Sequence, residues 1–165
     1  MNVKFIKLSE NAIVPCYGRK GDAGLDLFTA EEWVLEAGET RVLPTDIAIQ
    51  LPHGYEAQVR PRSGISLKGV DCVKMIEVYD TSKSFEENFH CKAYLRVQLG
   101  TVDSNYRGNI GIITYNQEDY DVIIPAGTKL AQLVIAPVIS AELVEVDSLE
   151  ESERGENGYG SSGNK

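Results

Sequence analysis

Hydrophobic and polar residues alternate with a period of two in short bursts along the chain. Such alternation is typical of half-buried β-strands, whose side chains point to opposite faces in turn. The bursts cover residues 3–8, 33–35, 40–43, 47–51, 55–60, 110–115, 122–124 and 130–135. Turn formers such as Gly38, Pro44 and Gly108 separate them. The pattern predicts an all-β protein of the sandwich, barrel or jelly-roll kind, without a long amphipathic helix.

Two stretches depart from this alternation. Residues 71–96 have strand-like ends around a polar centre, which favours a hairpin-like insertion. Residues 148–165 are rich in Gly, Ser and charge, so they offer almost nothing to bury and are expected to form a flexible C-terminal arm. The length of the chain suits one core, and we expect a single β domain over residues 1–147.

The net charge of the chain limits the kinds of partner that the protein can be expected to bind. The net charge is −9, so the general attraction to a polyanion is missing and nucleic acid is not expected as a partner. Residues 141–165 supply −5 of that charge, with seven acids against Arg154 and Lys165. A small anionic substrate therefore needs a divalent cation or well-placed arginines.

Cysteine usage and hydropathy indicate the compartment. Cys16, Cys72 and Cys91 form no Cys-x-x-Cys pair, and each is expected to be a small buried apolar residue. With only His53 and His90 beside them, no metal cluster is expected. The sequence contains neither an export signal nor a membrane-spanning stretch, so a reduced cytoplasmic setting is expected.

The C-terminal arm contains a literal GxGxxG over residues 158–163. Only two residues follow it, so the helix that a dinucleotide-binding fold needs is missing. Its bare glycine backbone could still wrap phosphates, with Arg154 pairing with them and Tyr159 offering a stacking face. From the residues alone, a lid over a nucleotide and a solubilising tail both remain open.

Residues 60–69 place Arg60, Arg62 and Lys68 around a Ser63–Gly64 step. Such a step often opens a turn whose amides meet an anion, which makes this segment a candidate phosphate site. An exposed basic turn is the alternative.

Residues 100–112 predict a hairpin whose turn carries Asp103 and Tyr106. A fixed carboxylate there could deprotonate a water, and the Tyr ring could lie against a flat or sugar-like group. A simple Asx turn explains the segment equally well.

Five segments in this order resemble the motifs of the trimeric dUTPases. They are AGLDLFTA at 23–30, PRSGISLK at 61–68, GTVDSNYRG at 100–108, AGTKLAQLVI at 126–135 and RGENGYGSSG at 154–163. The resemblance implies a jelly-roll-like dUTPase β barrel in a homotrimer, with three sites at the subunit interfaces and exchanged C-terminal arms. It also implies Mg²⁺-dependent hydrolysis of dUTP to dUMP and pyrophosphate.

The resemblance assigns roles to individual residues. Asp103 would activate the water that attacks the α-phosphorus, and Tyr106 would pack against the deoxyribose so that a ribose hydroxyl has no room. Asp26 would touch Mg²⁺ through water. Arg62 and Ser63 would polarise the leaving group. The remaining implied substrate contacts are Gly64, Gln132, Arg154, Tyr159, Gly160, Ser161 and Ser162.

This chain departs from the family at two places. Tyr159 stands where Phe is usual, which keeps the ring and should keep function. Ser63 and Asp103 lie forty positions apart, so about twenty residues within 71–96 are extra, as in dUTPases of phages of Gram-positive bacteria. Some of those proteins bind repressors, and repressor binding at the insert and a tolerated surface elaboration are both open readings.

Three other functions are alternatives to hydrolysis of dUTP. A dCTP deaminase-like protein would need a proton-transfer apparatus for which no motif is present. A nucleotide-sensing regulator whose insert binds a protein is compatible with catalysis. A purely structural β protein leaves the five motifs unexplained.

Overall fold

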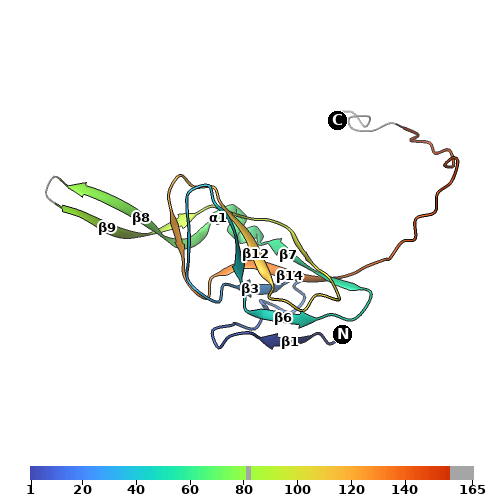
Figure 1. Ribbon diagram of the computed structural model, residues 1–165, viewed down its shortest axis with the longest axis horizontal. Coiled ribbons are helices and arrows are strands. Elements are labelled where there is room, and N and C mark those ends of the chain that lie inside the picture. The colour runs from blue at the N-terminus through green and yellow to red at the C-terminus, as the bar shows by residue number, and fades with distance from the viewer. Residues whose placement is uncertain (81–82, 157–165) are drawn as a thin grey trace.

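The computed structural model describes residues 1–80 and 83–156, with the backbone alone over 75–80 and 83–89. In this part of the chain strands dominate and the single helix is short, as the alternation predicts (Figure 1). The elements in chain order are β1 (Lys4–Lys7), β2 (Cys16–Tyr17), β3 (Leu25–Phe28), β4 (Trp33–Leu35), β5 (Thr40–Pro44), β6 (Ile47–Gln50), β7 (Tyr55–Pro61), α1 (Ser63–Lys68), β8 (Val70–Asp80), β9 (Lys83–Ala93), β10 (Leu95–Val97), β11 (Gly100–Val102), β12 (Gly111–Asn116), β13 (Val122–Ile124) and β14 (Lys129–Pro137).

The strands form four small sheets that wrap one core. The five-stranded sheet has the order β11-β7-β14-β3-β2, and the others are β10-β12-β5, β4-β13-β8-β9 and β1-β6. Every pairing between neighbouring strands is antiparallel. Leu27, Leu35, Leu43 and Ile112 are fully buried between the sheets. The expected all-β, jelly-roll-like barrel is confirmed.

Three expectations about local structure are wrong. Residues 100–112 do not form a hairpin, because β11 pairs with β7 whereas β12 pairs with β10 and β5 in another sheet. Residues 63–68 form a short helix, not the turn expected at the Ser63–Gly64 step. This helix has only six residues and buries only Ile65, so no hydrophobic period could reveal it in the sequence. Cys16 is exposed, because β2 lies at the edge of the five-stranded sheet, whereas Cys72 is buried as expected.

Two segments leave the barrel (Figure 1). The β8–β9 hairpin projects from one side, and its strands stay in continuous register from Val70 opposite Ala93 to Asp80 opposite Lys83. After β14 the chain runs away from the barrel on the opposite side, and residues 138–156 contain neither helix nor strand. Within the described residues, no helix is long and apolar enough to span a membrane.

Candidate active site

A group of charged and polar side chains gathers on the five-stranded sheet near α1. It consists of Asp26 on β3, Lys129 and Gln132 on β14, and Arg62 just after β7, and we call it the cationic cluster. These strands are neighbours, with Gln132 opposite Asp26 on one side and opposite Arg60 on the other. Residues opposite each other in an antiparallel pair share a face, so strand register brings the side chains together.

Asp26 lies at the centre of the cationic cluster between two cations. Its Oδ1 atom is 3.0 Å from Arg62 Nε, and its Oδ2 atom is 2.9 Å from Lys129 Nζ. Only 7% of Asp26 is exposed, and a carboxylate so buried needs such partners. Because two cations face one carboxylate, the cluster keeps a net positive charge that can attract a further anion.

The surroundings fix the other polar groups of the cationic cluster. Gln132 Nε2 donates a hydrogen bond to the Pro61 carbonyl at 3.0 Å. A Cβ atom on Gly24 would lie 2.6 Å from Gln132 Oε1, so a glycine leaves room for this side chain. Ser63 and Gly64 follow Arg62 in the first turn of α1, where backbone N–H groups have no partner within the helix. The cluster therefore offers several donors in one place.

The connection between β11 and β12, which lie in different sheets, is an exposed loop at residues 103–108. Its turn is closed by the Tyr106 amide, which donates to the Asp103 carbonyl at 3.1 Å, so the Asx turn considered from the sequence is a backbone turn instead. The Tyr106 hydroxyl donates to the Asn109 carbonyl at 3.0 Å. A Cβ atom on Gly108 would collide with the Tyr106 ring, so glycine is needed there to seat it. Asp103 remains exposed at the loop.

The base of this loop is held by a reciprocal pair between Asp46 and Asn109. The Asp46 amide donates to Asn109 Oδ1 at 3.0 Å, and Asn109 Nδ2 donates to Asp46 Oδ1 at 2.7 Å. Asp46 has a positive φ of 55°, a conformation that Asp and Asn tolerate better than most residues. Since the Asn109 carbonyl also accepts the Tyr106 hydroxyl, the pair connects the loop to the corner between β5 and β6.

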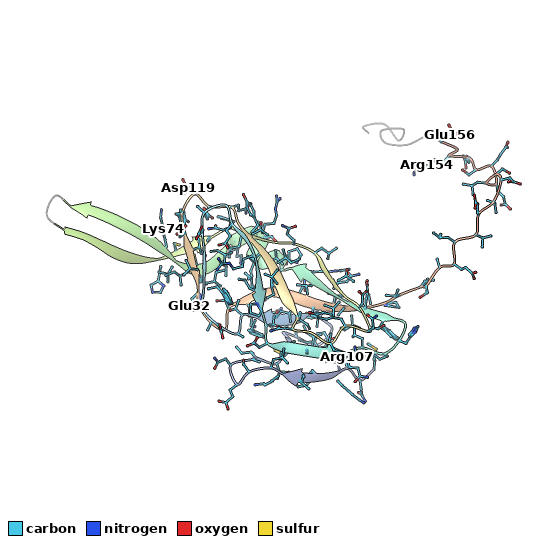
Figure 2. The ribbon with its side chains drawn as sticks, viewed as in Figure 1. Glu32, Lys74, Arg107, Asp119, Arg154 and Glu156 are labelled. Atoms are coloured by element: carbon cyan, nitrogen blue, oxygen red, sulfur yellow. The ribbon has the colours of Figure 1, made fainter. Side chains whose placement is uncertain are left out.

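Within one chain the loop and the cationic cluster lie at opposite ends of the sheet. β11 runs antiparallel to β7, and Val102 faces Ala57, so Asp103 comes about level with Glu56 near the start of β7, while Arg62 follows its end. Six residues of extended chain separate these positions, a distance of about 20 Å. Figure 2 agrees, because Arg107 of the loop lies on the β6 side of the barrel, away from α1.

The structure thus groups some of the sequence-predicted site residues and separates others. Asp26, Arg62, Ser63, Gly64 and Gln132 come together, whereas Asp103 and Tyr106 lie elsewhere in the same chain. Arg154 lies on the extended arm, far from the barrel (Figure 2). The candidate residues outside the described part of the chain are Tyr159, Gly160, Ser161 and Ser162.

Three residues that the structure places in or beside the site were not picked out from the sequence. Lys129 was visible inside the AGTKLAQLVI segment, but only the neighbouring strand shows that it pairs with Asp26. Asp46 and Asn109 are 63 positions apart, and nothing in the local pattern links them. Each role depends on strand register, which the sequence pattern does not specify.

The fold and the site together define an all-β barrel protein with a cluster of cationic side chains beside a short helix. A family model described as dUTPase matches residues 10–81 and 90–163. The chain belongs to the dUTPase family, as its five motifs predict. Residues 82–89, which separate the two matched stretches, lie inside the stretch expected to be an insertion.

Individual relatives agree with this family. The deoxyuridine 5'-triphosphate nucleotidohydrolase of Trichodesmium erythraeum is 41% identical over 163 residues, covering 99% of each chain. The Staphylococcus bacteriophage 80alpha dUTPase with dUPNHPP has a TM-score of 0.79 and 33% identity over 98% of each chain, and is described as controlling the transfer of virulence genes. A mutant dUTPase from phage phi11 of Staphylococcus aureus, described with a structural Mg(II) ion, has a TM-score of 0.72 and 30% identity over 92% of this chain and all of that one.

Proposed function

We propose that this protein hydrolyses dUTP to dUMP and pyrophosphate, limiting uracil incorporation into DNA and supplying dUMP for dTMP synthesis. The observation that carries the proposal is the cationic cluster beside α1, on the scaffold of a family whose members include a phage enzyme with the dUTP analogue dUPNHPP. The expected setting is the cytoplasm of a bacterial host, where three free cysteines are stable.

The reaction is an in-line displacement at the α-phosphorus. Asp103 orients a water molecule and accepts its proton, so that the oxygen attacks and pyrophosphate leaves. Arg62 and the first-turn groups of Ser63 and Gly64 hold the phosphate chain and stabilise the charge on the leaving group. Gln132 adds a hydrogen bond on the phosphate side, and Lys129 keeps Arg62 and Asp26 in place.

Specificity comes from the loop at residues 103–108. Tyr106 is held by its hydroxyl bond to Asn109, so its ring presents a fixed face to the deoxyribose and excludes a ribose 2′-hydroxyl. The backbone of this loop reads the edge of uracil. Arg154 grips the γ-phosphate, Tyr159 stacks on the base, and Gly160, Ser161 and Ser162 close over the phosphates as a lid.

Mg²⁺ is the proposed cofactor. The described residues contain no group of three or more His, Cys, Asp or Glu that could hold a metal ion. Asp26 supplies a hard oxygen donor in the cationic cluster, which suits a Mg²⁺ ion carried mainly by the substrate phosphates and reached through water. When bound, the ion neutralises phosphate charge; binding and proton transfer remain the work of the protein's own side chains.

A homotrimer with exchanged arms completes the site. The distance of about 20 Å between Asp103 and Arg62 means that one chain cannot apply both to the same nucleotide, so a second copy must supply one of them. The arm exposes the hydrophobic side chains of Ile139, Leu143, Val144 and Leu149. Such exposure to water is energetically unfavourable for a segment without a binding partner. Covering these residues on a neighbouring barrel also brings residues 154–163 to that copy's site.

The test is release of pyrophosphate by the purified protein with Mg²⁺. The substrates dUTP, dTTP, dCTP and UTP are offered separately at equal concentration, and only dUTP is expected to be consumed. Equal consumption of UTP would contradict the role of Tyr106. No hydrolysis of any of the four, by a protein that still binds dUTP, would favour a nucleotide-sensing regulator instead.

A second role is binding of a regulatory protein, such as a repressor, by the segment at residues 71–96. The β8–β9 hairpin projects from the barrel (Figure 1), and the family match skips 82–89, a stretch that includes more than half of β9. Because Glu77 faces Glu86, removing residues 77–86 shortens the hairpin without changing its register. Hydrolysis should survive this deletion while binding of a protein partner is lost. A folded variant that loses hydrolysis would contradict the separation of the two roles.

A further inference from the structure

The base of the β8–β9 hairpin contains two thiols in direct contact. Cys72 and Cys91 are 19 positions apart, yet they face each other across the antiparallel pair, and their Sγ atoms are 3.2 Å apart. Both side chains belong to the described part of the chain, on the barrel side of the hairpin. Cys72 is 2% exposed within the core, and Cys91 packs against the core from its edge.

We infer that Cys72 and Cys91 form a reversible dithiol–disulfide pair that staples the base of the hairpin when a small disulfide oxidant is present. This inference does not depend on the proposed hydrolysis. The sequence predicted only separate, buried apolar cysteines. The strand register brings Cys72 and Cys91 together as one site for covalent modification.

The geometry allows the bond without moving the strands. Opposite residues in an antiparallel pair have Cα atoms about 4.5–5.5 Å apart, which is inside the range that disulfides span. The two sulfur atoms need to approach by only about 1.2 Å from their present 3.2 Å to reach bonding distance. Rotation about χ1 of the two cysteines supplies a movement of this size, because nothing else stands between the sulfurs.

The environments of the two thiols determine which of them reacts first with the oxidant. Burial, followed by the hydrogen bond and charge of Cys91, raises the pKa of Cys72 to about 12, so this thiol stays protonated near neutral pH. Cys91 is half-buried whereas Cys72 is buried, so Cys91 is the more accessible cysteine of the two. Tyr120 lies beside it, and burial together with Glu118 and these cysteines raises the pKa of Tyr120 to about 12, so its hydroxyl also stays neutral.

The chemistry balances as a two-electron thiol–disulfide exchange. The thiolate of Cys91 attacks one sulfur of the small disulfide, forms a mixed disulfide and expels one thiolate. Cys72 then gives its proton to solvent base, and its sulfur attacks the Cys91 sulfur and expels the second thiolate. The two protein thiols are oxidised, the small disulfide is reduced to two thiols, and these take up the two protons.

The position of the pair explains why a bond there acts as a staple. β8 pairs with β13 of the barrel through Val73 and Lys74, immediately after Cys72, while β9 has no second partner strand in its sheet. Lys74 Nζ lies 3.8 Å from the centre of the Tyr120 ring, which also fixes β8 to the barrel side. A Cys72–Cys91 bond therefore ties the strand at the edge of the sheet to the strand that the barrel holds.

The experiment uses the full-length reduced protein treated with oxidised glutathione, followed by thiol counting and intact mass. A Cys16→Ser variant removes the exposed third thiol and isolates the pair. In this variant both remaining thiols should disappear, and the mass should fall by about 2 Da because two hydrogens leave. Trypsin should then yield residues 69–74 joined to residues 84–92, and dithiothreitol should separate them.

Two variants test the order of attack. Cys72→Ala should stop at a glutathione adduct on Cys91, and Cys91→Ser should give neither a linked peptide nor an adduct on Cys72. Cys91→Ser changes only the half-buried position, so it still tests the inference if Cys72→Ala fails to fold. Amide exchange over residues 70–74 and 90–93 should slow when the bond forms in the Cys16→Ser protein.

Three results would overturn the inference. One is a Cys16→Ser protein that collects glutathione without forming the linked peptide. Another is a link between two different copies, which mixing of isotopically labelled and unlabelled protein detects. The third is unchanged amide exchange at the base of the hairpin after the bond has formed, which would refute the staple.

Discussion

The cationic cluster and the loop at residues 103–108 hold their functional groups in opposite ways. In the cationic cluster, Asp26 is buried and joined to Arg62 and Lys129 by ion pairs of 3.0 and 2.9 Å, on strands in the middle of a sheet. In the loop, Asp103 is exposed and only the base is anchored, through Asn109. One region is complete within the chain, and the other presents its groups outward.

This difference fits the role that we propose for each region. Groups that hold a polyanion must be brought together before binding, because like charges repel and need Asp26 between them. A carboxylate that removes a proton must stay unpaired with cations, and an exposed loop at the far end of the sheet achieves that. Separating the two by about 20 Å keeps Asp103 from pairing with Arg62 in its own chain.

The largest expected effect on turnover comes from replacing Asp103. Asp103→Asn removes the proton acceptor but keeps the shape, so kcat should fall about 10³-fold while KM for dUTP changes little. Pyrophosphate release over a range of dUTP concentrations measures both. Asp119→Asn makes the same chemical change in another exposed loop and should leave turnover as it is. Wild-type turnover in the Asp103 variant would remove this residue from the mechanism.

The next largest effect tests whether Arg62 and Asp103 of one active site come from different copies of the chain. Arg62→Ala should also be almost inactive, because the phosphate chain loses its main cation. If Arg62 and Asp103 act from different copies, a refolded equal mixture of Arg62→Ala and Asp103→Asn should recover about a quarter of wild-type activity, since random assembly gives that share of intact sites. Each variant refolded alone is the control. A mixture no more active than its parts would place both residues in one chain's site.

A smaller effect is expected at Gly108. Gly108→Ala puts a Cβ atom into the Tyr106 ring, so the ring must move away from its present seat. We expect kcat/KM for dUTP to fall about tenfold and the preference for dUTP over UTP to shrink, because the deoxyribose loses its fixed wall. Kinetics with both nucleotides test this. Asn105→Ala, in the same loop but exposed, should preserve the preference.

The strands that could be predicted are those in which hydrophobic and polar residues alternate along the sequence. Segments such as 33–35 and 122–124 were predicted with the bounds that β4 and β13 have. β3 was not predicted as a strand because Asp26, Leu27 and Phe28 are all buried, so its pattern has no exposed face. β2, with two residues, is too short to show a period, and β10 overlaps the end of the stretch 71–96 that was assigned to the insertion.

The candidate site was predictable as motifs but not as geometry. The sequence places Asp26, Arg62 and Gln132 in separate motifs, and only strand register shows that they meet while Asp103 does not. The Cys72–Cys91 contact depends in the same way on where the hairpin turns. Since a slip of one residue would turn every side chain to the other face, local patterns cannot supply such contacts.

The smallest effect is expected for the Asp46–Asn109 pair, and it shows how firmly the loop is anchored. Asn109→Ala removes both side-chain bonds at 3.0 and 2.7 Å and should lower the free energy of unfolding by about 1–2 kcal/mol. KM for dUTP should rise a few-fold while kcat holds, because the backbone carbonyl that anchors Tyr106 is no longer held in place but Asp103 is untouched. Denaturant unfolding and steady-state kinetics measure the two effects.

Substitutions at Asp46 separate anchoring from general damage. Asp46→Asn keeps an oxygen that accepts the bond from Asn109 and tolerates a φ of 55°, so it should retain the wild-type KM. Asp46→Ala loses that acceptor and is strained at positive φ, so it should raise KM as Asn109→Ala does. Because both changes break one interaction, the double variant should be less affected than the sum of the two, with a coupling of about 1 kcal/mol. Additive effects would mean that Asp46 and Asn109 stabilise the barrel separately and that the loop is positioned by other contacts.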